Sequence, residues 1–182
     1  PEIAFAVNRD GARAVALAAS ELGIPVIHLS TDYVFDGTKA TPYVESDATG
    51  PTSIYGRSKL EGEQAVSEAT GNYAILRTAW VYSEYGNNFV KTMLRLSESR
   101  DEINVVADQF GCPTSANDIA TAIVAIARKL QEDSSIRRRG VFHLSGTGET
   151  NWANFAKQIF AFSEEHGGKS MIVNDIATAQ YP

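Results

Sequence analysis

Three residues between Ser30 and Glu63 carry side chains that together could move a proton at a ketone oxygen. Tyr55 and Lys59 are four residues apart, so on a helix they lie on one face, one turn apart. A phenol is a poor acid near neutral pH because its unperturbed pKa is about 10, and a nearby ammonium favours the phenolate. Such a tyrosine can donate a proton to a substrate oxygen or accept one from it. The hydroxyl of Thr31 could hold the same oxygen.

The Tyr-x-x-x-Lys pair by itself is a weak signal, since most such pairs are surface contacts. Its setting is more specific: the chain reads as a strand, STDYVFDG, a loop that contains prolines, YGRSKLEGE, and then the strand ILRTAWVY. The loop is long enough to bring the chain back from the strand end to the helix. We therefore expect Thr31, Tyr55 and Lys59 to meet at the rim of a sheet.

Helical patterns alternate with strand-length apolar runs along the chain, which favours an α/β fold with a mostly parallel, Rossmann-like sheet. Ligands of such sheets bind beyond the carboxyl ends of the strands, where Thr31 and Thr78 fall. We expect strands at 26–31, 73–82, 103–108, 141–145 and 171–175. We expect helices at 8–22 and 88–96. Three more helices are expected after N-cap residues: one from Thr52 or Ser53 to about 69, one from Thr114 or Ser115 to about 130, and one from Thr150 or Asn151 to about 162.

Composition limits the possible partners. The 182 residues carry a net charge of −6, and the only basic run is Arg137–Arg139, so nucleic-acid binding is not expected. No apolar run is long enough to cross a bilayer, and no signal peptide is visible. The single cysteine, Cys112, excludes a disulfide framework and fits a cytoplasmic protein. No His/Asp/Glu cluster has the spacing of a metal site.

The chain resembles the extended short-chain dehydrogenase/reductases, most closely the dTDP-4-dehydrorhamnose reductases among them. The likeness runs from AVN (Ala6–Asn8) to NWANFAKQI (Asn151–Ile159), and its specific pieces are STDYVFDG, PTSIYGRSKLEGE, LRTAWVYSEYGNNFV, VVADQFGCPT and FHLSGTGETNW. This resemblance implies reduction of the 4-keto group of dTDP-4-dehydro-L-rhamnose by NADPH or NADH. It also implies a dTDP-sugar as substrate and leaves a homodimer and a magnesium ion possible, although no ligand positions for the metal can be matched.

The resemblance also implies residue roles. Tyr55 matches the family's proton donor and is also implied as a cofactor contact, and Lys59 matches the lysine that assists it and bonds the nicotinamide ribose. Thr31 matches the catalytic threonine and also contacts the substrate. Substrate contacts are further implied for Asp32 and Tyr33, and Trp80 matches an aromatic residue beside the sugar.

The family's glycine-rich turn, which holds the cofactor pyrophosphate at a helix N-terminus, has no match in the chain. We therefore expect a fragment that lacks this N-terminal segment and the C-terminal end, and that binds the cofactor weakly alone. We expect residues 1–82 to be the remaining part of the dinucleotide-binding domain, and residues 83–182 to be mainly substrate-binding, with 116–145 returning to the Rossmann core.

Two other functions remain open. One is a non-catalytic regulatory subunit on the same scaffold, similar to the regulatory subunit of methionine adenosyltransferase. A binding module has no need for Thr31, so the presence of all three residues favours the enzyme. The other is a different nucleotide-sugar enzyme, an epimerase or a dehydratase. A dehydratase would usually carry an acid pair after the threonine, whereas here Asp32 is followed by Tyr33.

Three further positions invite a structural interpretation. Arg77 lies inside an apolar strand, so it needs a partner, and we favour a carboxylate over a phosphate. His28 and His143 also lie within apolar strands, and we expect hydrogen-bonded core residues rather than metal ligands. The segment 108–111 is interpreted either as a loop over the substrate or as a turn before the next helix.

Overall fold

A computed structural model describes residues 1–132 and 139–181 of the chain. The chain divides into two compact units: the first holds Pro1–Thr78 and Ile119–Leu144, and the second holds Ala79–Asp118 and Ser145–Pro182. Arg137 and Arg138, from the basic run noted above, lie outside the described residues. The cofactor-binding and substrate-binding roles expected for the two parts of the chain stay predictions.

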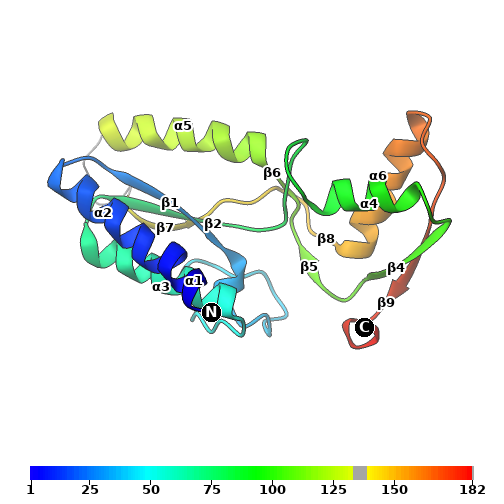
Figure 1. Cartoon of the computed structure of the whole chain (residues 1–182), viewed down its shortest axis with the longest axis horizontal. Coiled ribbons are helices and arrows are strands. Elements are labelled where there is room, and N and C mark those ends of the chain that lie inside the picture. Colours follow the sequence, from blue (N-terminus) through cyan, green and yellow to red (C-terminus); the bar gives the residue numbers. More distant parts are fainter. Residues whose placement is uncertain (133–138, 182) are drawn as a thin grey trace. The chain divides into compact units, whose positions relative to one another are not determined.

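The first unit contains a parallel three-stranded sheet in the order β1-β2-β7 (Figure 1). Its strands are β1 (Val26–Thr31), β2 (Tyr73–Thr78) and β7 (Gly140–His143). Because Thr31 lies beside Thr78 in the register, the carboxyl ends of β1 and β2 meet at one edge. The α/β fold class with parallel strands is confirmed, and β1 has the bounds predicted from the sequence.

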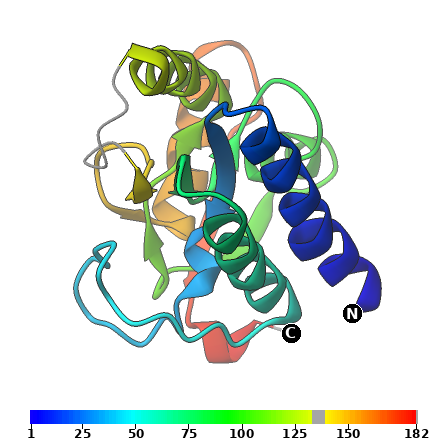
Figure 2. The ribbon, with the colours of Figure 1, turned by 90° about the vertical axis from the view of Figure 1, so that its left-hand side faces the viewer.

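Helices cover both faces of this sheet, with α2 and α3 on one side and α5 on the other (Figures 1 and 2). They are α2 (Ala12–Glu21), α3 (Ile54–Ala69) and α5 (Ala116–Glu132). The predicted helix start at Asn8 is wrong, because α1 (Glu2–Phe5) and the π-helical turn η1 (Ala6–Gly11) precede α2 without a break. Residues 2–7 contain no glycine or proline that would end a helix there.

The predicted strand 73–82 is wrong as a single element. Strand β2 of the first sheet ends at Thr78. The backbone then turns at Trp80, whose φ of 49° is rare for a residue other than glycine. After this turn β3 (Val81–Tyr82) pairs with β6 (Thr114–Ser115). Since the apolar run continues through the turn, hydrophobic periodicity could not show the break. Thr114 and Ser115 form β6, and α5 begins directly after them at Ala116, so the helix starts where the sequence predicted.

The second unit packs two helices against a pair of strands. Helix α4 (Phe89–Ser97) begins at the N-cap Asn88 and α6 (Trp152–Glu165) at the N-cap Asn151. Strand β4 (Glu102–Val106) pairs in parallel with β9 (Ile172–Ile176), and β5 (Phe110–Gly111) pairs antiparallel with β8 (Thr150–Asn151). Their shared core contains Met93, Ile103, Val105, Ala153, Ala156, Ile159 and Phe160.

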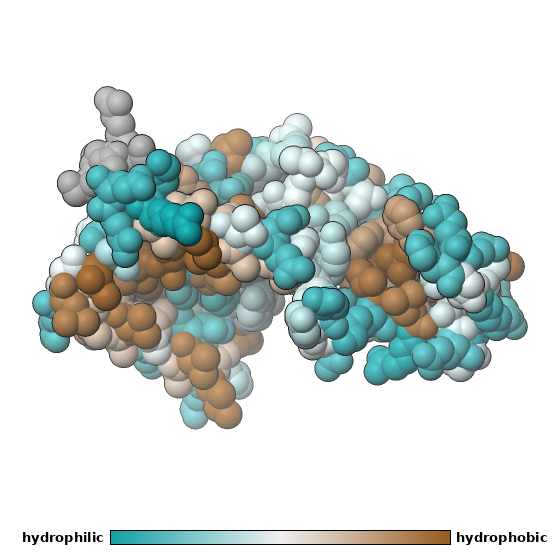
Figure 3. Space-filling model, turned by 90° about the horizontal axis from the view of Figure 1, so that it is seen from above, coloured by the Kyte–Doolittle hydropathy of each residue, from teal (hydrophilic) through white to brown (hydrophobic). Residues whose placement is uncertain are grey.

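Apolar side chains also reach the surface of both units. The face drawn in Figure 3 carries several apolar patches. Large apolar residues with at least half of their surface exposed include Leu22 (72%), Ile24 (50%) and Phe162 (61%). Apolar surface of this kind commonly marks contact areas. Within the described ranges, no helix has both the length and the apolar character needed to cross a bilayer.

Candidate active site

Thr31 ends β1 at the sheet edge, and its hydroxyl is fixed by the residues that follow it. The side chain is almost completely buried, at 5% exposure. Its Oγ1 donates to Oδ1 of Asp32 at 3.0 Å and accepts from the backbone N–H of Tyr33 at 3.2 Å, which starts the short helix η2 (Asp32–Val34). Burial raises the pKa of the Asp32 carboxyl, and the Thr31 hydrogen bond opposes this. The rim of the sheet thus holds a hydroxyl and a carboxyl in fixed positions.

Gly56 allows helix α3 to approach this rim closely. A Cβ at this position would lie 2.1 Å from the carbonyl oxygen of Tyr33, so no larger residue fits. The approach places the ring of Tyr55 edge-on to the ring of Tyr33, with centroids 5.8 Å apart and planes at 74°. Tyr55 remains 50% exposed and Tyr33 57% exposed, so both phenols are open to a ligand in this unit.

Lys59 lies one helical turn beyond Tyr55 and reaches the same strand. Its Nζ donates to the backbone carbonyl oxygen of Leu29 in β1 at 2.6 Å. Burial lowers the pKa of the Lys59 ammonium, and the nearby Glu63 carboxylate opposes the change. An ammonium has three donors, so the bond to Leu29 leaves Lys59 able to bind a further oxygen.

His28 lies in β1, near the charge of Lys59 in α3, and stays neutral. Burial, followed by the positive charge of Lys59, lowers the pKa of His28 to about 4. The prediction of hydrogen-bonded core histidines fails at Nε2 of His28 and of His143, since each of these atoms is buried without a partner among the described residues.

Arg77 is paired with a carboxylate, as predicted. Its Nε and Nη2 donate to the two carboxylate oxygens of Glu63 in α3, at 2.9 and 2.7 Å, and both side chains are nearly fully buried, at 6% and 5% exposure. The guanidinium also lies over the ring of Phe35, 5.0 Å from its centroid. This pair ties α3 to β2, directly beside the strand that carries Thr31.

Trp80 belongs to the second unit, whereas the other five predicted site residues belong to the first. Its indole stacks on that of Trp152, with centroids 3.5 Å apart and planes at 12°. Gly111 is required beside it, because a Cβ there would lie 2.6–2.9 Å from three atoms of the Trp80 ring. The predicted position of Trp80 beside a sugar stays a prediction.

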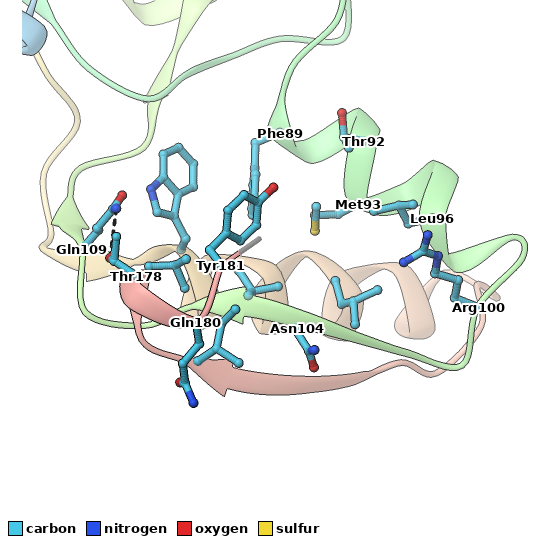
Figure 4. A pocket seen from close by; sticks show the side chains of 15 residues that line it. Phe89, Thr92, Met93, Leu96, Arg100, Asn104, Gln109, Thr178, Gln180 and Tyr181 are labelled. Carbon is cyan, nitrogen blue, oxygen red and sulfur yellow. Dashed lines mark hydrogen bonds between the residues drawn. The ribbon is translucent and has the colours of Figure 1, made fainter. Parts of the chain in front are cut away.

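A cavity of about 860 Å³ opens in the second unit (Figure 4). Apolar side chains from α4, β4 and β9 form most of its wall, with Arg100 at one end and Gln109 at the other. Gln109 Nε2 donates to Oγ1 of Thr178, and Asp108 accepts from the N–H and the hydroxyl of the same threonine at 2.9 and 2.6 Å. These bonds tie the segment 108–111 to the helical turn η4 (Thr178–Gln180).

In the described part of the chain, no three His, Cys, Asp or Glu side chains gather into a group that could hold a metal ion. The sequence did not single out two features of the site. One is the carbonyl of Leu29, whose role cannot be seen from a side-chain pattern. The other is Glu63, which the spacing Tyr55, Lys59, Glu63 could have indicated, since four-residue steps place all three on one helix face.

Comparisons with known proteins extend over the whole chain. The family model of the RmlD substrate binding domain matches residues 1–182. A Sinorhizobium fredii protein named dTDP-4-dehydrorhamnose reductase is 62% identical over 182 residues, which cover 100% of this chain and 62% of that protein. The chain therefore spans a little over three fifths of the length of this curated relative.

Solved structures give the same match. The crystal structure of a dTDP-4-dehydrorhamnose reductase from Clostridium acetobutylicum superposes with a TM-score of 0.90 at 38% identity, covering 100% of this chain and 60% of that one. A dTDP-4-dehydrorhamnose reductase from Bacillus anthracis, in complex with NADP, has a TM-score of 0.85 at 41% identity and covers 95% of this chain and 58% of that one.

Proposed function

Since the chain belongs to the family of the RmlD substrate binding domain, we propose that the whole protein reduces the 4-keto group of dTDP-4-dehydro-L-rhamnose to give dTDP-L-rhamnose. The observation that supports this best is the grouping of Thr31, Tyr55 and Lys59 around the carboxyl end of β1. The cofactor proposed is NADPH or NADH, in keeping with the NADP bound in the Bacillus anthracis relative.

In this proposal the chain's own residues hold and protonate the ketone oxygen. Tyr55, with its exposed phenol, donates a proton to the alkoxide that develops at the sugar C4. The single hydroxyl proton of Thr31, which is donated to Oδ1 of Asp32 in the free protein, turns to the same oxygen when the substrate binds, and such a donor stabilises the developing charge. Lys59 supplies a positive charge that favours loss of the phenol proton, and its free donors fit the hydroxyls of a nicotinamide ribose. A bound cofactor would supply the hydride.

For the second unit we propose a role in holding the substrate. A cavity of about 860 Å³ is within the size range of small-molecule sites, and its mix of apolar walls and few polar groups is typical of them. The guanidinium of Arg100 could pair with a phosphate oxygen. Trp80, with its ring supported by Trp152, is proposed to lie against the sugar.

The competing functions are less well supported. A regulatory subunit would have no use for a threonine hydroxyl fixed at the sheet rim beside an exposed phenol. A dehydratase would usually carry a second acid after Asp32, and the following residue is Tyr33, whose ring contacts that of Tyr55.

The test is an assay of the intact natural protein with dTDP-4-dehydro-L-rhamnose, following the oxidation of NADPH and of NADH by absorbance. We expect cofactor oxidation that depends on the sugar and yields dTDP-L-rhamnose by mass spectrometry and NMR. If the cofactor is oxidised only with a different nucleotide-sugar ketone, the proposed substrate is wrong. A protein that binds the cofactor but reduces no sugar would favour the regulatory subunit.

A second measurement concerns the 182-residue chain by itself. We propose that it binds reduced nicotinamide cofactor weakly, because none of its glycines forms the three-glycine turn that holds a pyrophosphate. Fluorescence titration with NADPH should show no saturation in the micromolar range. Saturation at micromolar concentration would contradict this part of the proposal.

A further inference from the structure

Glu63 is a buried carboxylate that the proposed chemistry does not use. It is 4% exposed, lies in α3, and both of its oxygens accept hydrogen bonds from Arg77 in β2. Burying such a pair costs desolvation energy that the mutual attraction seldom exceeds by much, so apolar residues of similar size often serve stability equally well. The pair therefore calls for a role other than stability.

The position of the pair suggests that role. Tyr55, Lys59 and Glu63 follow one another at four-residue steps on α3, so they share a face of the helix. Lys59 is anchored on β1 at Leu29, and Glu63 is anchored on β2 at Arg77. In the sheet register Arg77 lies beside Ser30, the residue between Leu29 and Thr31. Two adjacent anchors thus fix the rotation and the height of this helix face relative to the rim.

We propose that Glu63, held by Arg77, is the positioning residue for Lys59: it keeps the ammonium charged and directed at the end of β1, where Tyr55 and Thr31 lie. This inference deepens the proposed function and, in its catalytic part, rests on it. The carboxylate acts through Lys59 and does not touch the substrate. The two hydrogen bonds from Arg77 prevent the Glu63 carboxylate from turning away from the helix face.

The electrostatic surroundings of Lys59 agree with this role. Burial lowers its pKa, while Glu63 raises it and so opposes loss of the charge. His28, the nearest titratable group in β1, stays neutral and adds no charge of its own. The other charged or titratable groups on elements in contact with α3, and on α3 itself, are Glu2, Arg9, Asp10, Arg13, Glu21, Asp32, Tyr33, Tyr55, Arg57, Glu61, Glu68, Tyr73 and Arg77.

Glu63→Gln tests the inference because it removes the charge and keeps the volume and one acceptor for Arg77. Its matched control is Glu61→Gln, which removes a carboxylate from the same helix, where it pairs with Arg9. The readout is acetylation of Lys59 by acetic anhydride between pH 6 and 11, quantified by peptide mass spectrometry on the intact natural protein. The rate at each pH divided by the plateau rate reports the deprotonated fraction, whatever the accessibility of the amine.

In Glu63→Gln we expect the Lys59 acetylation profile to move to lower pH, with a several-fold higher relative rate at pH 8, and in Glu61→Gln we expect the wild-type profile. Turnover of the sugar should fall in Glu63→Gln, with an earlier loss of activity on the alkaline side, and KM for NADPH should rise because Lys59 is also proposed to bind the nicotinamide ribose. Glu63→Asp should restore part of both. An unchanged acetylation profile in folded Glu63→Gln would overturn the inference.

The two proposals can fail separately. If the wild-type protein does not reduce the sugar but the Lys59 profile moves, the proposed function is wrong and the coupling of Glu63 to Lys59 stands. If the sugar is reduced and the profile does not move, the inference alone is wrong. Should Glu63→Gln not fold, the double variant Glu63→Leu with Arg77→Met replaces the pair by apolar side chains of similar volume. A smaller shift in the same direction is then expected, because the positive charge of Arg77 is removed as well.

Discussion

The ring of Tyr33 meets the ring of Tyr55 edge-on, with centroids 5.8 Å apart, and this contact joins the end of β1 to the start of α3. It depends on Gly56, which lets the helix come within backbone contact of Tyr33. The two phenols stay exposed at 57% and 50%. The contact therefore fixes the ring of Tyr55 without covering its hydroxyl, as a proton donor requires.

Replacing Tyr55 by phenylalanine should remove the proton donor and keep this ring contact. We expect turnover of the sugar to fall by about 10²–10⁴-fold, which is the usual rate enhancement from general acid catalysis. The free energy of unfolding should stay nearly unchanged. Steady-state kinetics and denaturant unfolding on the intact protein measure the two quantities. Tyr73→Phe in β2 is the matched control and should keep full activity. Normal turnover in Tyr55→Phe would reject the assigned role.

Replacing Lys59 by methionine should remove the charge that favours the phenolate and the bond to Leu29. We expect turnover at pH 7 to fall by about tenfold or more, because the phenolate left after proton transfer is no longer stabilised by a positive charge, and we expect the loss of activity on the alkaline side to move to higher pH. The pH–rate profile of the variant checks this.

Lys91→Met is the control for this substitution, since Lys91 also donates from Nζ to a backbone carbonyl, that of Glu84 at 3.0 Å, in the second unit. It should leave the pH profile in place. If Lys59→Met and the wild-type protein share one profile at reduced turnover, Lys59 only supports the structure.

Sequence patterns predicted those parts of the fold and site that depend on local chemistry. β1 and α3 follow from an apolar run and from Ser53 as N-cap, and the alternation of elements gives the parallel sheet. The pairing of Arg77 with a carboxylate follows from the cost of burying a charge. The break at Trp80 and the strand at Thr114 could not be predicted, because both depend on pairing between segments far apart in the chain.

His28 should make the stability of the protein fall in acid. Burial lowers its pKa from 6.5 to about 4, so between these pH values the unfolded chain binds a proton that the folded chain does not. The free energy of unfolding therefore rises with pH across this window, and the stability that neutral His28 contributes is lost as the pH falls through it. From pH 7 to pH 4 the loss due to His28 should be about 2–3 kcal/mol, since one pKa unit corresponds to about 1.4 kcal/mol.

The variant His28→Leu isolates this effect, because the leucine fills similar space and does not titrate. Urea unfolding at several pH values should give a smaller loss of stability in His28→Leu than in the wild type between pH 7 and pH 4. His166→Leu, at an exposed position of the second unit, should follow the wild-type curve. Parallel curves for wild type and His28→Leu would show that His28 is not buried as a neutral group.

Adding a methyl group at Gly111 should disturb the stacked tryptophans of the second unit. The new Cβ would lie 2.6–2.9 Å from the Trp80 ring, which is itself stacked on Trp152 at 3.5 Å, so the ring must move. We expect Gly111→Ala to lower the free energy of unfolding by about 1–3 kcal/mol, to weaken the near-ultraviolet circular dichroism of the tryptophans and to raise KM for the sugar more than it lowers kcat. Gly71→Ala, which has open space around its Cβ, should change none of these. A weakened tryptophan signal with an unchanged KM would show that Trp80 does not contact the sugar.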